Sequence, residues 1–167
     1  MAKVPLIRID SRLIHGQVAT KWIKRVEAKR VVIIDDPSAA DSFLVTIYQM
    51  AATPGVKVDV FSTKQAGEEW QKDQFGTAGP IVVLFRSVEQ AFLAYEAGFT
   101  YTELQLGGIG GGPGRVNVAG PIALDRNDGV MLHKLDQNGV DIHCQVTPEE
   151  RVTPWKTVKA KFFSDVE

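Results

Sequence analysis

Short apolar runs alternate with amphipathic stretches along the whole chain, and this alternation constrains the fold more than any other feature. The expected strands are Val4–Ile9, Val31–Ile34, Val56–Phe61, Ile81–Phe85, Glu103–Leu106 and Val140–Val146, with a weaker candidate at Val116–Val118. The stretches between them have the helical period and are His15–Glu27, Pro37–Ala52, Thr63–Asp73, Ser87–Ala97 and Arg126–Asn138. Strands alternating with helices of this length indicate repeated βαβ units and a mainly parallel sheet.

The strands also indicate where the helices lie. Val31–Ile34 and Ile81–Phe85 are apolar at every position, as strands are when helices cover both faces of a sheet. The length of 167 residues fits one compact domain. We therefore predict that residues 1–167 form a single three-layer α/β domain, with a mostly parallel sheet of six or seven strands and helices on both faces.

Local signals add detail near the second helix and at the end of the chain. Asp36 before Pro37 predicts a helix cap followed by proline at the first helical position. The segment from Thr153 onward is typical of a short helix. It carries the aromatic residues Trp155, Phe162 and Phe163. The pattern leaves open whether these rings pack on the domain or on a partner.

Composition limits the kinds of function. The 19 basic and 20 acidic residues nearly cancel, giving a net charge of −1, which argues against a nucleic-acid-binding protein with a basic face. The single cysteine, Cys144, allows no internal disulfide framework and predicts a buried strand thiol. No apolar run approaches the roughly 20 residues of a membrane-spanning helix, and the N-terminus has no signal-peptide layout. We expect a cytoplasmic protein.

The polar residues that follow the first strand form the densest group of candidate site residues. Asp10, Arg12 and His15 lie within six residues, directly before a helix. Backbone N–H groups and the dipole at a helix start favour a bound phosphate, which makes Gly16 and Gln17 candidate phosphate contacts. Arg12 offers two parallel donors to an oxyanion, and Asp10 is placed to orient the ring of His15 or the guanidinium of Arg12.

These residues also have a purely structural interpretation. A histidine at a helix start is often a cap, and Asp10 and Arg12 could simply pair with each other. Arg86 and Ser87 follow the fourth strand, where they could bind a phosphate or lie at a solvated helix start. Spacing alone does not decide between these alternatives.

The other candidate residues favour structural roles. The glycine-rich segment Gly107–Gly114 does not have the spacing of a dinucleotide fingerprint or a P-loop, so we expect a turn or docking loop rather than a phosphate cradle. Asp35 and Asp36 are better explained by helix capping than by a metal site. His133 and His143 fall inside a helix and a strand. We predict no metal and no cofactor.

The run Ile7-Arg8-Ile9-Asp10-Ser11-Arg12-Leu13-Ile14-His15-Gly16-Gln17-Val18 resembles the active-site signature of the IIB subunits of the mannose/fructose/sorbose family. These subunits belong to the bacterial phosphoenolpyruvate-dependent sugar phosphotransferase system. The resemblance extends over nearly the whole chain. It includes the aspartates after the second strand, the glycine-rich segment, and the late pattern from Leu135 to Val140 followed by Val146-Thr147-Pro148.

The resemblance implies a function. His15 would receive a phosphoryl group, on Nδ1, from a phosphohistidine of a IIA partner that is a separate or fused chain. The chain would pass this group to a sugar held by the membrane subunits IIC and IID, as a protein-N(pi)-phosphohistidine–sugar phosphotransferase peripherally associated with the inner face of the plasma membrane. Arg12 would bind the phosphate and Asp10 would orient its neighbours. The sugar, homo-oligomer formation and the role of the glycine loop are left open.

Two other functions fit a histidine near a phosphate site. A histidine phosphatase places its nucleophile after the first strand, but this chain has Ile14 where those enzymes have arginine, and it lacks a clear second active-site histidine. A phosphate- or nucleotide-sensing module would bind at the same helix start without forming a bond.

Overall fold

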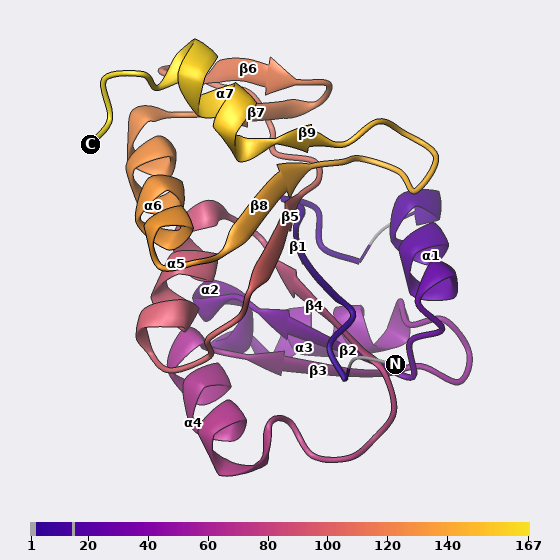
Figure 1. The fold of residues 1–167 in the computed structure, drawn as a ribbon. Coiled ribbons are helices and arrows are strands. Elements are labelled where there is room, and N and C mark those ends of the chain that lie inside the picture. Colours follow the sequence, from indigo (N-terminus) through magenta and orange to yellow (C-terminus); the bar gives the residue numbers. More distant parts are fainter. Residues whose placement is uncertain (1–2, 15) are drawn as a thin grey trace.

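A mostly parallel sheet runs through the centre of the molecule. The structure, a computed structural model, describes residues 3–14 and 16–167. Within this part, seven strands pair in the order β3-β2-β4-β1-β5-β8-β9, and all pairs are parallel except β8 with β9 (Figure 1). The strands are β1 Leu6–Ile9, β2 Arg30–Ile34, β3 Lys57–Phe61, β4 Ile81–Phe85, β5 Glu103–Leu106, β8 Asp141–Cys144 and β9 Thr153–Pro154. The predicted sheet is confirmed.

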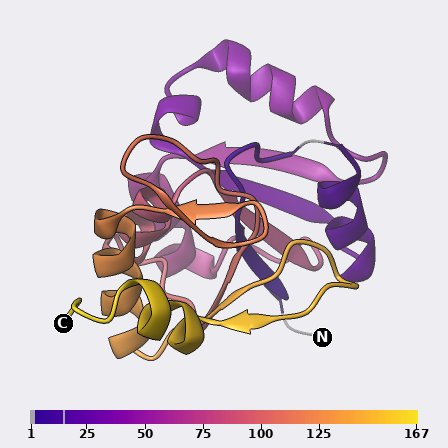
Figure 2. The same ribbon diagram turned by 90° about the horizontal axis from the view of Figure 1, so that it is seen from above.

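Helices cover both faces of the sheet, as the apolar strands predict. Alternate side chains of β2 enter two separate cores: Val31 and Ile33 face one, and Val32 and Ile34 face the other. The first core is covered by α1 (Gly16–Arg25) and α3 (Ser42–Met50), and the second by α4 (Thr63–Asp73), α5 (Val88–Glu96), α6 (Arg126–Gln137) and α7 (Trp155–Phe162). Figure 2 shows α3 on the face opposite α6 and α7.

The single helix predicted at Pro37–Ala52 is wrong, because the chain forms two helices there. The short α2 (Asp36–Ala39) ends before Asp41, whose carboxylate accepts the backbone N–H groups of Phe43 at 3.0 Å and Leu44 at 3.2 Å and so caps α3. The cap of α2 is also one residue earlier than predicted. Asp35 accepts from Ser38 N, and Pro37 is the second helical residue.

A second, two-stranded antiparallel sheet follows the glycine-rich segment. The weak strand candidate corresponds to β6 (Val116–Ala119), which pairs with β7 (Ile122–Leu124), a strand that the sequence did not reveal. Ile109 attaches this hairpin to the main body: its N–H donates to Pro121 O at 3.1 Å, and its carbonyl accepts from Ala123 N at 2.9 Å. The hairpin therefore continues directly from the loop after β5.

The C-terminal helix packs on the domain, which decides an alternative that the sequence left open. Trp155 and Phe163 are buried in the second core, on the face of the sheet that α6 covers, and their rings stack with centroids 5.9 Å apart. Phe162 is partly buried against the same core. Gly129 on α6 makes room for this contact, since a Cβ there would lie 2.7 Å from the ring of Phe163. The end of the chain is thus part of the core.

Candidate functional site

Three neighbouring strands bring the sequence-predicted residues to one edge of the sheet. β4, β1 and β5 lie side by side and parallel, so their carboxyl ends meet. The backbone N–H of Asp10 donates to Phe85 O at 2.9 Å, that of Gly107 to Ile9 O at 2.8 Å, and that of Ser11 to Gly108 O at 2.8 Å. The loop after β1 is therefore held between the end of β4 and the first two glycines after β5.

The first turn of this loop is built around Asp10. Its carboxylate Oδ1 accepts the backbone N–H of Arg12 at 3.0 Å, and its carbonyl accepts the N–H of Leu13 at 2.9 Å. Leu13 has φ of 56° and is 1% exposed. A positive φ is unfavourable for a bulky residue by about 1–3 kcal/mol, and burial of the Leu13 side chain stabilises it. As Leu13 turns inward, the side chain of Arg12 remains 61% exposed.

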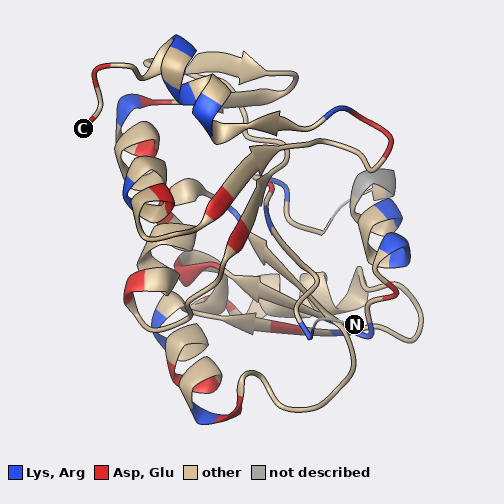
Figure 3. Ribbon diagram, in the orientation of Figure 1, with Lys and Arg blue, Asp and Glu red and all other residues tan. Residues whose placement is uncertain are grey.

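The structure does not describe every predicted site residue. His15 lies outside the described residues, and so does the side chain of Gln17. Gly16, which begins α1, has φ of 52° in the left-handed region that favours glycine. The first turn of α1 has no acidic side chain, and its last turn carries Lys24 and Arg25. Figure 3 shows the basic positions of this helix in blue. The start of α1 is thus electrostatically open to an anion.

Arg86 connects the loop after β1 to the other side of the site. Its Nη1 donates to Ser11 O at 3.2 Å, its Nε donates to Asp35 Oδ2 at 3.3 Å, and its Nη2 donates to Ser38 Oγ at 3.5 Å and to the hydroxyl of Tyr48. The side chain is 38% exposed. Arg86 thus does more than precede a solvated helix. It keeps an exposed edge beside residues 10–15, the segment between β1 and α1 that is called the signature loop below.

The remaining polar residues at this edge act as helix caps. Ser87 Oγ accepts the N–H of Gln90 at 3.2 Å and caps α5. Asp35 accepts both the N–H and the hydroxyl of Ser38. Asp36 accepts the N–H of Thr63 at 2.7 Å, the first residue of α4. These contacts fix the elements that surround the site.

Arg8 is the residue that sequence reasoning missed. It is only 2% exposed on β1, and its Nη2 lies 3.5 Å from Asp10 Oδ2. Its guanidinium also donates to Gln105 Oε1 and to the carbonyls of Gln145 at 2.8 Å and Val146 at 3.0 Å. Burial lowers the pKa of Arg8, because desolvation disfavours its charge; the Asp10 carboxylate opposes this shift. A charged residue inside an otherwise apolar strand was the available signal.

The glycine-rich segment has two different parts. A Cβ on Gly107 would lie 2.3 Å from Cζ and Nη2 of Arg8, and one on Gly108 would lie 3.5 Å from Asp10 Oδ1. These two glycines are buried against the site, whereas the stretch from Gly110 to Gly114 is exposed. The expectation of a turn or docking loop is therefore limited to the exposed stretch from Gly110 to Gly114.

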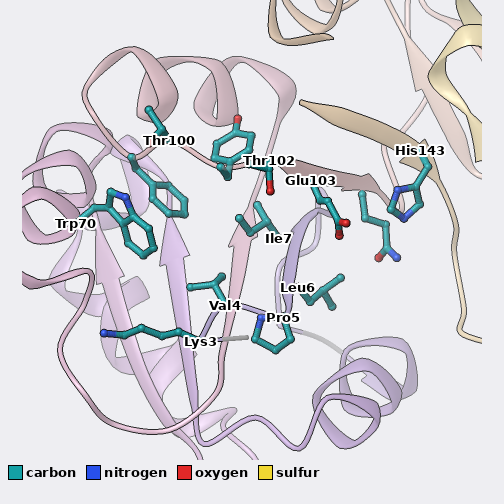
Figure 4. Close-up of a pocket in the computed structure, with 13 residues that line it drawn as sticks. Lys3, Val4, Pro5, Leu6, Ile7, Trp70, Thr100, Thr102, Glu103 and His143 are labelled. Atoms are coloured by element: carbon teal, nitrogen blue, oxygen red, sulfur yellow. The ribbon is translucent and has the colours of Figure 1, made fainter. Parts of the chain in front are cut away.

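Two hollows lie in different parts of the molecule. A groove of about 490 Å³ lies beside the signature loop, lined by Ile14, Gly16, Ala19, Thr20, Lys21, Ile23, Lys24, Ala51 and Thr53. A cavity of about 420 Å³ lies near the amino ends of β1 and β5, with Trp70 and His143 on opposite sides (Figure 4). Since ligands of such sheets bind at carboxyl ends, the second cavity is separate from the candidate site.

The histidine and cysteine predicted to be structural on β8 lie in the sheet. Burial lowers the pKa of His143, an effect that the carboxylates of Asp141 and Glu103 oppose. Cys144 is 2% exposed, and burial raises the pKa of its thiol to about 12. The thiol is therefore protonated and unreactive near neutral pH.

Comparison with known proteins identifies the relatives of this arrangement. The family model described as PTS system sorbose subfamily IIB component matches residues 4–165. The sorbose-specific EIIB component of Klebsiella pneumoniae is 31% identical over 148 residues, covering 89% of this chain and 90% of that protein. The mannose-specific EIIAB component of Escherichia coli K12 is 30% identical over 85% of this chain, which spans 44% of that longer protein.

Solved structures agree with the sequence relatives. The crystal structure of manxB from Thermoanaerobacter tengcongensis is 36% identical and superimposes with a TM-score of 0.86, covering 96% of this chain and 97% of that one. The IIBSor domain of the sorbose permease from Klebsiella pneumoniae is 28% identical, with a TM-score of 0.85 and coverage of 96% and 98%. Within the described residues, no helix has the length and apolarity that crossing a membrane demands.

Proposed function

Because the chain belongs to the sorbose subfamily of IIB components of the sugar phosphotransferase system, we propose that it carries a phosphoryl group on His15. The donor is a phosphohistidine of a IIA protein or domain, and the acceptor is a sugar bound by the membrane subunits IIC and IID. The chain then works at the inner face of the membrane through these partners. When His15 accepts the group, the P–N bond at the donor imidazole breaks as one forms at Nδ1 of His15. When the sugar accepts it, this P–N bond breaks as a P–O bond forms at a sugar hydroxyl, which gives up its proton.

The observation that carries this proposal is the meeting of Asp10, Arg12 and Arg86 beside the start of α1. Arg12 has an exposed guanidinium, and Arg86 keeps an exposed edge on the other side of Ser11. Two guanidinium groups and a helix start supply donors and positive charge to the oxygens of a phosphoryl group in transfer. Catalysis of this kind depends on positioning and electrostatics, so the chain needs no cofactor of its own. Gly16, Gln17 and Ser87 are secondary candidates for phosphate contact.

A protein donor also fits the surface beside the site. Helix α3 exposes Phe43, Ile47 and Met50 to 71%, 41% and 81%, and its end borders the groove that reaches the signature loop. Exposed apolar side chains that gather on one helix are typical of protein interaction sites. The mannose-specific EIIAB relative carries both components in one protein, which supports a IIA partner for this chain.

The experiment that tests the proposal is phosphorylation by a phosphorylated IIA protein. The wild type, His133→Gln and His143→Gln should each accumulate an acid-labile phosphate, whereas His15→Ala should fold normally and accept none. Labelling that persists in His15→Ala would falsify the assignment of His15. Hydrolysis without accumulation would indicate a phosphatase, and reversible phosphate binding alone a sensor.

Arg12 provides a second arm of the same test. Arg12→Ala should slow transfer at least about a hundredfold, the usual effect of losing one electrostatic donor in the transition state. Arg12→Lys should restore only part of the rate, because an ammonium supplies charge without the paired donors of a guanidinium. The melting temperature should change little, since the side chain is 61% exposed. An unchanged rate in Arg12→Ala would move the phosphate site towards Arg86.

A further inference from the structure

We propose that Arg8 is a positioning residue for phosphoryl transfer, holding Asp10 and, through it, the loop that carries Arg12 and His15. This inference rests on the function proposed above. Arg8 itself is only 2% exposed, so it does not reach a phosphoryl group presented by a partner. It acts through the carboxylate that it contacts.

The two oxygens of Asp10 face different groups. Oδ2 lies 3.5 Å from Nη2 of Arg8, and Oδ1 accepts the backbone N–H of Arg12 at 3.0 Å. The carboxylate thus connects a buried strand cation to the backbone of the signature loop. If Arg8 is removed, Oδ2 loses this guanidinium contact, and the carboxylate can shift towards the space that Arg8 leaves. The backbone of Arg12 would move with it.

Arg8 is itself fixed on every side by groups from distant parts of the chain. It bonds the side chain of Gln105 on β5 and the carbonyls of Gln145 and Val146 after β8. Its Cζ lies 5.4 Å from the centre of the Trp22 ring on α1, and the indole N–H of Trp22 donates to the same Val146 carbonyl at 2.9 Å. The guanidinium is therefore a rigid reference point shared by β1, β5, α1 and the segment after β8.

Stability alone does not account for a charged residue at this position. Replacing a buried ion pair by well-packed apolar residues is often neutral or stabilising. Leu6, which lies on the same face of β1 as Arg8, belongs to the apolar core there and shows what an ordinary core strand would carry. A cation that contacts the carboxylate of the signature loop has a further use, because a displacement of about 1 Å at a reacting group lowers the rate about a hundredfold.

The chain offers a matched control in Arg30. This residue is also a buried strand arginine, 9% exposed on β2, and its Nε lies 2.6 Å from Asp59 Oδ2. It begins β2, at the end of the sheet opposite the signature loop. Arg30→Met therefore removes a comparable buried cation without touching Asp10.

The test is single-turnover transfer from a phosphorylated IIA protein, measured over a range of donor concentrations. Arg8→Met should lower the maximal rate about a hundredfold, while the half-saturating donor concentration stays within about twofold, because Arg8 is not at the surface. Arg8→Lys should recover part of the rate, since it keeps the charge but not the paired donors. Arg30→Met should transfer at the wild-type rate. A wild type that accepts no phosphate would instead refute the proposed function.

A double variant separates positioning from general damage to the fold. If Arg8 acts through Asp10, the loss in Arg8→Met/Asp10→Asn should be no greater than the larger of the two single losses. Circular dichroism checks folding. If Arg8→Met does not fold, Arg8→Lys still reports the effect of Arg8, and the double variant should transfer at the rate of Asp10→Asn alone; neither variant leaves an isolated buried charge. The proposal would be overturned if the loss of rate in the double variant equalled the product of the two single losses. A wild-type rate in Arg8→Met or Arg8→Lys would overturn it as well.

Discussion

Substitution of Gly107 by alanine tests how firmly the guanidinium of Arg8 is held. The new Cβ would lie 2.3 Å from Cζ and Nη2 of Arg8 and 2.6 Å from Nε. Carbon atoms in contact are about 3.5–4.0 Å apart, so the guanidinium must retreat by about 1 Å. Its bonds to the carbonyls of Gln145 and Val146, at 2.8 and 3.0 Å, would then break or lengthen.

The expected cost follows from these contacts. Overpacking of a filled core costs about 1–3 kcal/mol, and each hydrogen bond to a charged group contributes about 1.5–3 kcal/mol. The reduced freedom of the unfolded chain offsets about 0.4–1 kcal/mol. With one of the two bonds lost, these contributions leave a net destabilisation of about 1.5–5.5 kcal/mol. It corresponds to a fall in melting temperature of about 3–22 °C for a chain of this size.

Two other glycines serve as controls in thermal and urea unfolding. A Cβ on Gly108 would make an ordinary contact at 3.5 Å from Asp10 Oδ1, so Gly108→Ala should change the free energy of unfolding by less than about 0.5 kcal/mol. A Cβ on Gly67 would lie 2.1 Å from the carbonyl oxygen of Ala97, so Gly67→Ala should destabilise the fold but leave transfer by the folded protein unchanged. A Gly107→Ala protein as stable as the wild type would refute the argument that Arg8 is fixed.

Two further predictions concern buried titratable groups on β8. Burial lowers the pKa of His143 below its ordinary 6.5. The imidazole is therefore protonated more readily in the unfolded chain than in the folded one. The stability that this group contributes is present above pH 6.5 and is lost as the pH falls towards the lowered pKa. Over this pH range the melting temperature of His143→Gln should decrease less than that of the wild type. Parallel curves of melting temperature against pH would show that His143 does not cause the decrease. Cys144, whose thiol pKa is raised to about 12, should react with iodoacetamide at neutral pH only after denaturation; rapid labelling of the native protein would show that the strand opens.

The extent to which the fold could be predicted depended on how local each signal was. The main strands, their alternation with helices and hence the mainly parallel sheet follow from apolar periodicity, which is a property of neighbouring residues. The break between α2 and α3 had a local signal in Asp41 before Ser42, but the apolar pattern that continues through Phe43 concealed it. The strand β7 is three residues long, and its pairing with β6 depends on a tight turn rather than on a periodic pattern.

The candidate site divides in the same way. Asp10 and Arg12 could be found because they follow one strand directly, and parallel strands place such residues at a common edge. The partners of Arg8 could not be found by the same reasoning, since Gln105 and Gln145 lie 97 and 137 residues away in sequence. Only the pairing of β1 with β5, and of β5 with β8, brings them together.

If this edge of the sheet is the proposed phosphoryl site, its charges explain how the group is held there without being trapped. Among the described residues of the network, Arg8, Arg12 and Arg86 face Asp10 and Asp35, so three positive charges less two negative charges leave one positive charge. A phosphoryl group adds about −1.5 to −2 charges, which carries the site from mildly positive to mildly negative. A large excess of cations would bind the group too tightly to pass it on. A site near balance in both states suits a carrier, which must accept and donate the same group with comparable ease.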